Sequence, residues 1–495
     1  MKQYKVIADK NLIVGQTEDT LFSSFIEHLG RAVYGGIYEP AHPTADKDGF
    51  RNDVAKAVES LDLALVRYPG GNFVSGYFWE DGIGPKEKRP TKREEAWHSI
   101  ETNEVGTDEF MKWAQKVGVK PMMAVNLGSG TTDNARNLVQ YCNADDDSKY
   151  AALRRQYGSE KPYGVTYWGL GNEMDGDWQI GHLPADKYVE KAKEAARKMK
   201  EVDPSIKFIA CGSSGIDMAT FPEWDRIVVD GLYEEADYLS IHQYFFESTT
   251  EDDYFASNLA MENYIGVFRD LLGYVQTKHR HKKPFYLCFD EYNVWYNTKP
   301  LPEEYQVAPA ILQEHQSMKD TLVFGGLTNA LLNNCDIVKI ACLAQLVNVI
   351  APIMTENGGA MVYNTIWYPF YDFCHYMRGT SLKTLVAGGE TFDSRFGKAR
   401  YISQAITHNG KELVIQVVNY AKEKTQVDFE IGGFSGFELI SHKEMHDDDL
   451  NARNTFADPN RVTPHEVEGK IKIDGGKVSV ELKELSWNLI RLRLK

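Results

Sequence analysis

Two glutamates of this chain closely follow short apolar stretches of the kind that form buried β-strands. Glu173 comes just after the stretch 165–170, and Glu291 comes directly after the stretch 285–290. A retaining glycosidase uses one carboxylate as nucleophile and a second, about 5–5.5 Å away, as general acid and base. At that distance and an effective dielectric of about 20, Coulomb's law gives ~3 kcal/mol of repulsion, so one carboxyl stays protonated while the other is charged. The pair therefore predicts cleavage of a glycosidic bond.

Further polar and aromatic side chains follow other strand-like stretches or lie in the loops beyond them. They are Glu27, Arg67, Asn72, Asn172, His242, Tyr244, Trp178 and Trp295. In a barrel of parallel strands the carboxyl ends of all strands meet in one bowl, so we expect these residues to share it. Trp178 in particular has the character of a surface on which a sugar ring stacks.

Two other interpretations compete for the glutamates. A single glutamate at a strand end more often forms a salt bridge or caps a helix, although that does not explain why so many polar residues fall at the same rim. Glu173, Asp175 and Asp177 carry carboxylates on alternate residues, a pattern that can bind calcium. The twelve-residue EF-hand pattern is absent, however, and we expect no metal.

The periodicity of the chain predicts a (β/α)8 barrel. Apolar strand-like stretches alternate with longer helix-like segments, which is the pattern of β/α units on a parallel sheet. Eight such stretches lie at 22–28, 62–68, 120–126, 165–170, 207–211, 238–243, 285–290 and 337–343. The clearest helix is expected over 185–202, where Pro184 precedes the start and Asp203 with Pro204 ends it.

Beyond residue 382 the pattern changes to alternating strands with hairpin signals. Asn409-Gly410 separates the stretches 400–408 and 412–420, and a second hairpin is expected over 470–482. This predicts a C-terminal, jelly-roll-like β-sandwich that also takes up the N-terminal segment 4–14. The expected domains are therefore residues 1–20 with the sandwich, 21–382 as the barrel, and 383–495 as the sandwich itself.

The composition of the chain disfavours several classes of binding partner. The 495 residues include 55 Lys and Arg against 71 Asp and Glu, a net charge of −16, which repels nucleic acid and anionic lipid surfaces. The stretch 341–354 is too short and too polar to span a membrane, and the N-terminus has no apolar signal region. We therefore expect a cytoplasmic protein. The six cysteines show no C-x-x-C spacing and are expected to be buried reduced thiols.

Several long segments resemble glycoside hydrolase family 51, the α-L-arabinofuranosidases. YWGLGNEMDGDWQIG (167–181) and FDEYNVWY (289–296) resemble the acid/base and nucleophile motifs of that family. Other similar segments, in the same order, are FIEHLGRAVYGGIYEP (25–40), RYPGGNFVSGYFWEDGIGP (67–85), ETNEVGTDEF (101–110), AQLVNVIAPI (344–353) and DDLNARNTF (448–456). The likeness covers nearly the whole chain. Asn293 departs from the family pattern, in which tryptophan is commoner at this position.

The resemblance implies a role for each candidate residue. Glu173 would be the acid/base and Glu291 the nucleophile, and Asn172 would bind the sugar 2-hydroxyl. His242 and Tyr244 would orient the carboxylates. The furanose hydroxyls would be held by Glu27, Arg67, Asn72 and Gln345, with Trp295 as a wall of the site. The family further implies retention of anomeric configuration, no cofactor, and a cytoplasmic homohexamer.

The leading hypothesis is an exo-acting enzyme that removes terminal arabinofuranose from arabinoxylan or arabinan oligosaccharides. A furanosidase that also accepts D-galactofuranose, and a β-xylosidase or endoglucanase of the same family, remain open because the loops around the bowl decide the sugar. A catalytically dead carbohydrate-binding barrel is the non-enzyme alternative. It predicts the loss of one carboxylate, whereas both are present.

Overall fold

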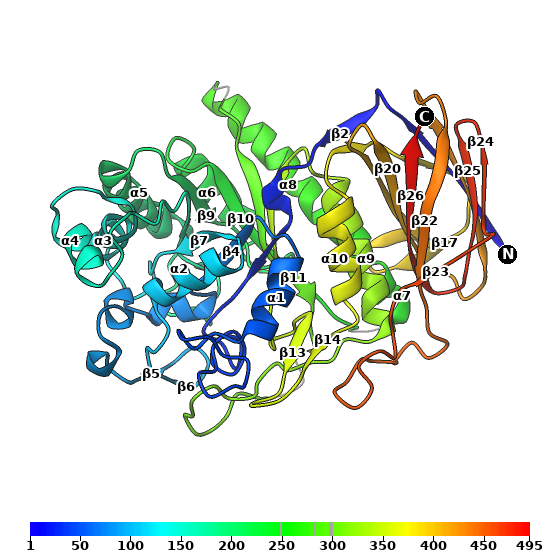
Figure 1. Ribbon diagram of the computed structural model, residues 1–495. Helices are drawn as coiled ribbons and strands as arrows, with labels where there is room; N and C mark the ends of the chain where they lie inside the picture. The colour runs from blue at the N-terminus through cyan, green and yellow to red at the C-terminus, as the bar shows by residue number, and fades with distance from the viewer. Residues whose placement is uncertain (248–249, 281–282, 297–299) are drawn as a thin grey trace.

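A closed barrel of eight parallel strands forms one half of the molecule (Figure 1). The computed structural model describes residues 1–247, 250–280, 283–296 and 300–495. The barrel strands are β3 (Ser23–Phe25), β4 (Leu65–Tyr68), β7 (Lys120–Ala124), β8 (Tyr167–Leu170), β9 (Lys207–Cys211), β10 (Tyr238–Phe245), β11 (Tyr286–Val294) and β12 (Val338–Ala344). They pair in the order of the chain, and β12 closes the ring against β3. Each strand lies within or overlaps one of the eight predicted stretches, so the predicted barrel is confirmed.

Helices cover the outside of the barrel. They are α1 (Asn52–Ser60), α2 (Thr107–Lys116), α3 (Thr132–Asn143), α4 (Lys149–Gln156), α5 (Ala185–Val202), α6 (Glu223–Gly231), α7 (Glu251–Phe255), α8 (Ser257–His279), α9 (Met318–Leu332) and α10 (Trp367–Tyr376). Helix α5 has the bounds expected from the sequence. Its buried side chains, among them Tyr188, Ala192 and Met199, recur at helical spacing and form the stripe that faces the barrel.

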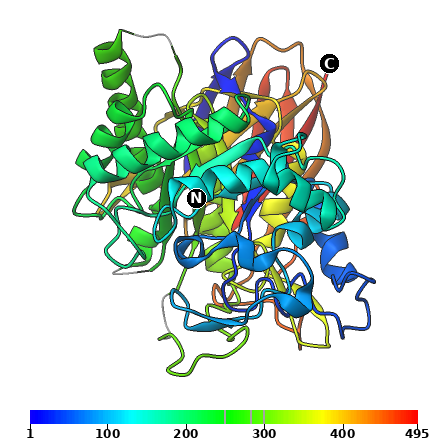
Figure 2. The same cartoon turned by 90° about the vertical axis from the view of Figure 1, so that its left-hand side faces the viewer.

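Two β-sheets packed face to face form the other half, and they lie behind the barrel when the molecule is viewed from the barrel side (Figure 2). The five-stranded sheet contains β16 (Leu385–Ala387), β1 (Lys2–Asp9), β21 (Thr425–Gly432), β25 (Lys477–Leu482) and β24 (Ile471–Asp474). The seven-stranded sheet contains β2 (Ile13–Gln16), β15 (Thr380–Leu382), β19 (Ile402–His408), β20 (Glu412–Asn419), β26 (Ser486–Leu494), β22 (Phe437–Met445) and β23 (His465–Glu466).

The N-terminal segment belongs to both sheets of this sandwich. Strand β1 pairs with β21 and β16, whereas β2 pairs with β15 in the opposite sheet. The expectation that the N-terminus completes the sandwich is therefore confirmed. Strand β15 already belongs to the sandwich just before residue 383, and the domain boundaries at residues 20 and 382 stay a proposal.

The sandwich is attached to the barrel through a strand buried on both faces. Ile415 of β20 points into the sandwich core, whereas Gln416 points toward α9. The amide nitrogen of Gln416 donates to the carbonyl of Gly325 and to the side chains of Thr328 and Asn329. Helices α9 and α10 accordingly lie between the two halves (Figure 1).

In the described part of the chain, three short hairpins complete the fold. They are β5 (Lys92–Glu94) with β6 (Ser99–Glu101), β13 (Ile353–Thr355) with β14 (Met361–Tyr363), and β17 (Thr391–Ser394) with β18 (Gly397–Arg400).

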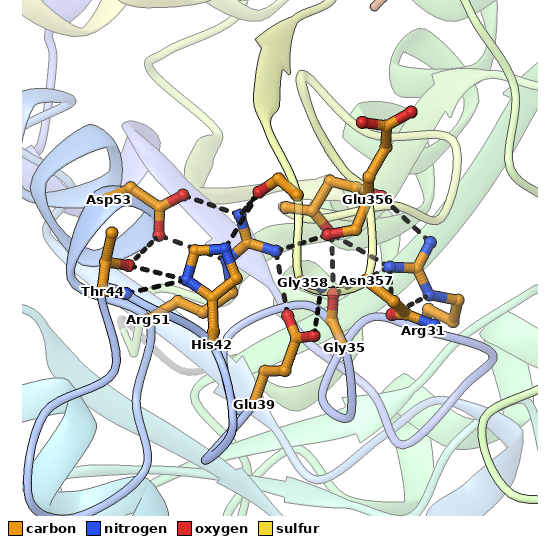
Figure 3. A network of polar contacts seen from close by, with 12 residues as sticks. Arg31, Gly35, Glu39, His42, Thr44, Arg51, Asp53, Glu356, Asn357 and Gly358 are labelled. Atoms are coloured by element: carbon orange, nitrogen blue, oxygen red, sulfur yellow. Dashed lines mark hydrogen bonds and ion pairs between the residues drawn. The ribbon is translucent and has the colours of Figure 1, made fainter.

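The hairpin β13–β14 is fastened to the loop after β3 by two arginines (Figure 3). Arg31 donates to the side chain of Asn357 and to the carbonyl of Thr355. The fully buried Arg51 pairs with Glu39 and Asp53 and also donates to backbone carbonyls at the hairpin tip. Bidentate guanidinium contacts of this kind fix geometry as well as charge. The loops that follow β3 and β12 are therefore joined into one wall at the rim of the barrel.

All six cysteines are free and buried, as predicted. In the described part of the chain, no helix combines the length and the apolar character that crossing a bilayer requires.

Candidate active site

The two glutamates meet at the carboxyl ends of the barrel strands. Glu173 lies in the loop after β8, and Glu291 lies within β11. A carboxylate oxygen of each, together with a ring nitrogen of His242 from β10, forms a group in which all atoms lie within 4.8 Å of one another. Residues that are distant in the sequence are thus brought together at the end of the barrel where active sites of this fold occur.

The carboxylate of Glu291 is held by two donors. Nη1 of Arg67 lies 2.5 Å from its Oε1, and the hydroxyl of Tyr244 donates to its Oε2 at 2.8 Å. Arg67 is buried, and its remaining nitrogens contact Asp290 at 3.1 Å and the side-chain oxygen of Asn172 at 2.5 Å. One guanidinium therefore fixes three polar side chains at the end of the barrel.

The hydrogen bonds to Glu173 come from other residues than those to Glu291. His242 Nδ1 lies 2.9 Å from its Oε1, and the indole nitrogen of Trp178 donates to its Oε2 at 2.8 Å. Burial and the nearby charge of Glu291 raise the pKa of Glu173 above its ordinary value, although the bonds from His242 and Trp178 oppose the rise. Glu173 is thus suited to hold a proton.

His242 lies between carboxylates on both sides of its ring. Its Nε2 is 3.3 Å from Oδ1 of Asp290, which also accepts a hydrogen bond from Ser240. Burial alone would lower the pKa of His242, but the charges of Glu291 and Asp290 raise it well above the ordinary value. For Asp290, burial acts to raise the pKa. The charges of Arg67 and His242 outweigh this effect and lower the pKa below its ordinary value. The floor of the site is therefore a buried network of paired charges.

Glu27 and Gln345 form a second polar cluster on the wall described above. The backbone nitrogen of Glu27 donates to Gln345, and the amide of Gln345 donates back to the Glu27 carboxyl at 3.2 Å. The same carboxyl accepts bonds from the backbone of Phe73 and the indole of Trp97, both at 2.9 Å. Burial and the charge of Glu291 raise the pKa of Glu27 to about 8, although the bonds from Phe73 and Trp97 oppose the rise.

The remaining predicted residues also lie at this end of the barrel. Asn172 donates to Asn72 at 3.3 Å. The ring of Trp295 packs edge-on against Tyr244, with 5.1 Å between the ring centroids. Trp178 is the most open member of the set, with 51% of its surface exposed. The structure thus brings all of the predicted site residues to the same rim.

Sequence reasoning missed three contributors and raised one alternative that the geometry does not favour. Asp290, Ser240 and Trp97 contact predicted site residues, but the sequence assigned them no role in binding or catalysis. The calcium alternative required Glu173, Asp175 and Asp177 to converge, yet the Asp175 carboxylate accepts two hydrogen bonds from Ser214 instead. Within the described residues, the group with metal-like spacing is Glu173, His242 and Glu291, whose members already contact one another.

Comparisons with known proteins agree over the whole chain. The model of the alpha-L-arabinofuranosidase 1 domain matches residues 57–259, and that of the alpha-L-arabinofuranosidase C-terminal domain matches residues 290–486. The intracellular exo-alpha-(1->5)-L-arabinofuranosidase 1 of Bacillus subtilis is 44% identical over 100% of this chain and 99% of its own length. The exo-alpha-(1->6)-L-arabinofuranosidase of Bifidobacterium longum is 39% identical over 100% of this chain and 98% of its own length.

Solved structures give the same result. A family 51 α-L-arabinofuranosidase from Bifidobacterium longum superposes with a TM-score of 0.93 at 36% identity, covering 99% of both chains. The arabinose complex of the Thermotoga maritima α-L-arabinofuranosidase gives a TM-score of 0.87 at 34% identity, covering 99% of this chain and 100% of the other. The predicted family and enzyme class are confirmed, and the chain belongs to glycoside hydrolase family 51, the α-L-arabinofuranosidases.

Proposed function

We propose that this protein is a retaining, exo-acting α-L-arabinofuranosidase in which Glu291 is the nucleophile and Glu173 the acid/base. The observation that carries the proposal is the approach of their carboxylate oxygens to within 4.8 Å. Retaining enzymes need about 5–5.5 Å between the two carboxyl groups, whereas inverting enzymes leave about 6.5–9.5 Å for a water molecule. The close spacing favours direct attack on the sugar.

In the first step Glu291 attacks the anomeric carbon while Glu173 gives its proton to the departing glycosidic oxygen. The bond to the leaving group breaks as the bond to Glu291 forms, which yields a covalent glycosyl-enzyme ester. The ester has no negative charge, so the repulsion that helps to keep Glu173 protonated disappears. The pKa of Glu173 then falls, and its carboxylate can take a proton from the water that hydrolyses the ester.

The other residues bind and orient the sugar in this proposal. Asn172, positioned by Arg67, binds the 2-hydroxyl, where a hydrogen bond strengthens as the transition state develops. Arg67, Tyr244 and His242 align the two catalytic carboxylates. Glu27, Gln345 and Asn72 hold the other hydroxyls, while Trp295 walls the site and Trp178 offers an exposed ring beside Glu173.

The proposed substrates are arabinoxylan or arabinan oligosaccharides with a terminal α-L-arabinofuranosyl residue. Relatives of similar identity carry names that specify 1→5 and 1→6 linkages, so the linkage has to be measured. The names of several relatives describe intracellular enzymes, and we propose a cytoplasmic location here. The homohexamer implied by the family resemblance is likewise a proposal.

The test compares initial rates on aryl α-L-arabinofuranoside, β-D-galactofuranoside, β-D-xyloside and β-D-glucoside, with proton NMR of the first-formed sugar. Fast release of α-arabinofuranose from the first substrate alone is expected. First-formed β-arabinofuranose would overturn the retaining mechanism. Comparable rates on the galactofuranoside would mean a relaxed furanosidase, and no release from either furanoside would overturn the substrate assignment.

A further inference from the structure

The backbone of Glu173 adopts a conformation that residues with side chains rarely take. Its φ angle is +44°, in the left-handed region, at the turn that leads out of β8. Such a conformation persists only where the surrounding structure holds it. Within the turn, the backbone nitrogen of Gly176 donates to the carbonyl of Glu173 at 2.9 Å. The conformation of Glu173 therefore also depends on contacts from outside the turn.

Asp175, two residues after Glu173, supplies such a contact. Its Oδ2 accepts a hydrogen bond from the backbone nitrogen of Ser214 at 3.0 Å, and its Oδ1 accepts one from the Ser214 hydroxyl at 2.5 Å. Ser214 lies in the loop between β9 and α6. Both oxygens of one carboxylate thus accept hydrogen bonds from a single residue of the neighbouring loop. Hydrogen bonds to charged acceptors are short and strong.

The same neighbouring loop also contacts the residue that faces the Glu173 carboxyl. The backbone nitrogen of His242 donates to the carbonyl of Ser213 at 3.2 Å, while the His242 ring lies 2.9 Å from Glu173. Glu173 is therefore tied to residues 213 and 214 by two routes, through His242 and through Asp175. The Asp175 contact therefore lies on one of the two paths that connect this neighbouring loop with Glu173.

We infer that Asp175 and Ser214 are positioning residues for proton donation by Glu173. This inference rests on the acid/base role proposed above for Glu173. Neither residue touches the reacting atoms or the sugar. The pair fixes the strained turn so that the Glu173 carboxyl meets the leaving-group oxygen.

The chain contains a matched control for this contact. Ser213, the adjacent residue, makes the same pair of hydrogen bonds to Asp225 of α6. The backbone nitrogen of Ser213 donates to Asp225 at 2.8 Å, and the Ser213 hydroxyl donates to it at 2.6 Å. Asp225 fastens the loop from the side of helix α6, whereas Asp175 fastens it from the loop that carries Glu173. One of these two carboxylates, Asp175, belongs to the turn of Glu173, whereas Asp225 reaches Glu173 indirectly, through Ser213 and His242.

The experiment measures kcat/KM for Asp175→Asn, Ser214→Ala, Asp225→Asn and Glu173→Ala on two substrates. One is 2,4-dinitrophenyl α-L-arabinofuranoside, whose leaving group needs little protonation, and the other is an α-linked arabinobiose, whose leaving group needs a full proton. General acid catalysis contributes roughly 10²- to 10⁴-fold, so misplacement of the acid should cost the arabinobiose roughly 10- to 100-fold. The activated substrate should lose less than about 3-fold.

The results distinguish the positioning role of Asp175 and Ser214 from the acid/base role of Glu173. Selective loss on arabinobiose in Asp175→Asn and Ser214→Ala, with an equal effect of Asp225→Asn on both substrates, supports the inference. Equal loss on both substrates in all three variants shows a purely structural contact and overturns it. The activated substrate also reports whether each variant folds. If Glu173→Ala itself lacks the selectivity, the acid/base assignment fails, which is distinct from failure of the positioning pair alone.

Discussion

The bowl of the barrel and the core of the sandwich are buried to a similar degree, but charged side chains line the bowl and apolar side chains fill the sandwich core. In the bowl, Arg67, His242, Asp290 and Glu291 are almost fully buried and carry or share charge. The sandwich core consists of apolar residues such as Val427, Phe429 and Ile431, which alternate along β21 with outward polar side chains. The difference is that one interior is organised by paired charges and the other by apolar packing.

This contrast indicates where the protein gives up stability for function. Burying charges costs free energy that pairing only partly recovers, and replacing such networks by apolar residues is often neutral or stabilising. Glu173 adds a left-handed backbone conformation to the same region. The sandwich core shows neither feature among its clustered residues. Substitutions in the bowl should therefore change activity far more than stability, and substitutions in the sandwich should do the reverse.

The largest effect is expected for Glu291→Ala. Removing the nucleophile should lower kcat on every arabinofuranoside by roughly 10⁴-fold or more, because no covalent intermediate can form. Its loss also removes one of the clustered carboxylates, while Arg67 keeps Asp290 as a partner. The urea midpoint of unfolding should therefore stay close to that of the wild type. A midpoint that falls as far as that of a sandwich-core variant would break the comparison.

An intermediate effect, on stability alone, is expected for Phe429→Ala. Phe429 is fully buried and pairs with Val6 on one side and Val478 on the other, so truncation leaves a cavity between the sheets. The loss should be about 3–5 kcal/mol, measured by urea unfolding, with kcat/KM at 25 °C unchanged within about 2-fold. The control is Glu430→Ala, the next residue on the outer face, whose exposed pair with Lys5 should contribute less than about 1 kcal/mol.

Periodicity alone predicts most of this fold. The eight strand-like stretches, the helix α5 and the hairpin β19–β20 with its Asn409-Gly410 turn are all local patterns, which is why they can be read without tertiary information. The two-sheet position of the N-terminus follows less directly. It depends on pairings such as β1 with β21 that join residues more than 400 positions apart.

The site divides in the same way between local and non-local information. Glu173 and Glu291 stand out because each comes after an apolar stretch of the sequence, but a strict two-residue period would place Asp290 and Glu291 on opposite faces of β11. The register of β11 is irregular between Phe289 and Tyr292, and both carboxylates therefore reach Arg67. Trp97 and the Asp175–Ser214 contact join separate loops, and no local pattern predicts such pairs.

The smallest effect is expected for Trp178→Phe, which sharpens the comparison by altering the bowl at its exposed edge. The indole bond to Glu173 lowers the pKa of that carboxyl, so its removal should raise the pKa and move the alkaline limb of the kcat/KM profile to higher pH. The shift should be below about one pH unit, because half of the Trp178 surface is exposed and water can replace the bond. Trp295→Phe is the matched control, since the Trp295 indole nitrogen donates to none of the described residues. An equal shift in both variants would mean that the limb responds to the loss of an aromatic wall rather than to a hydrogen bond on Glu173.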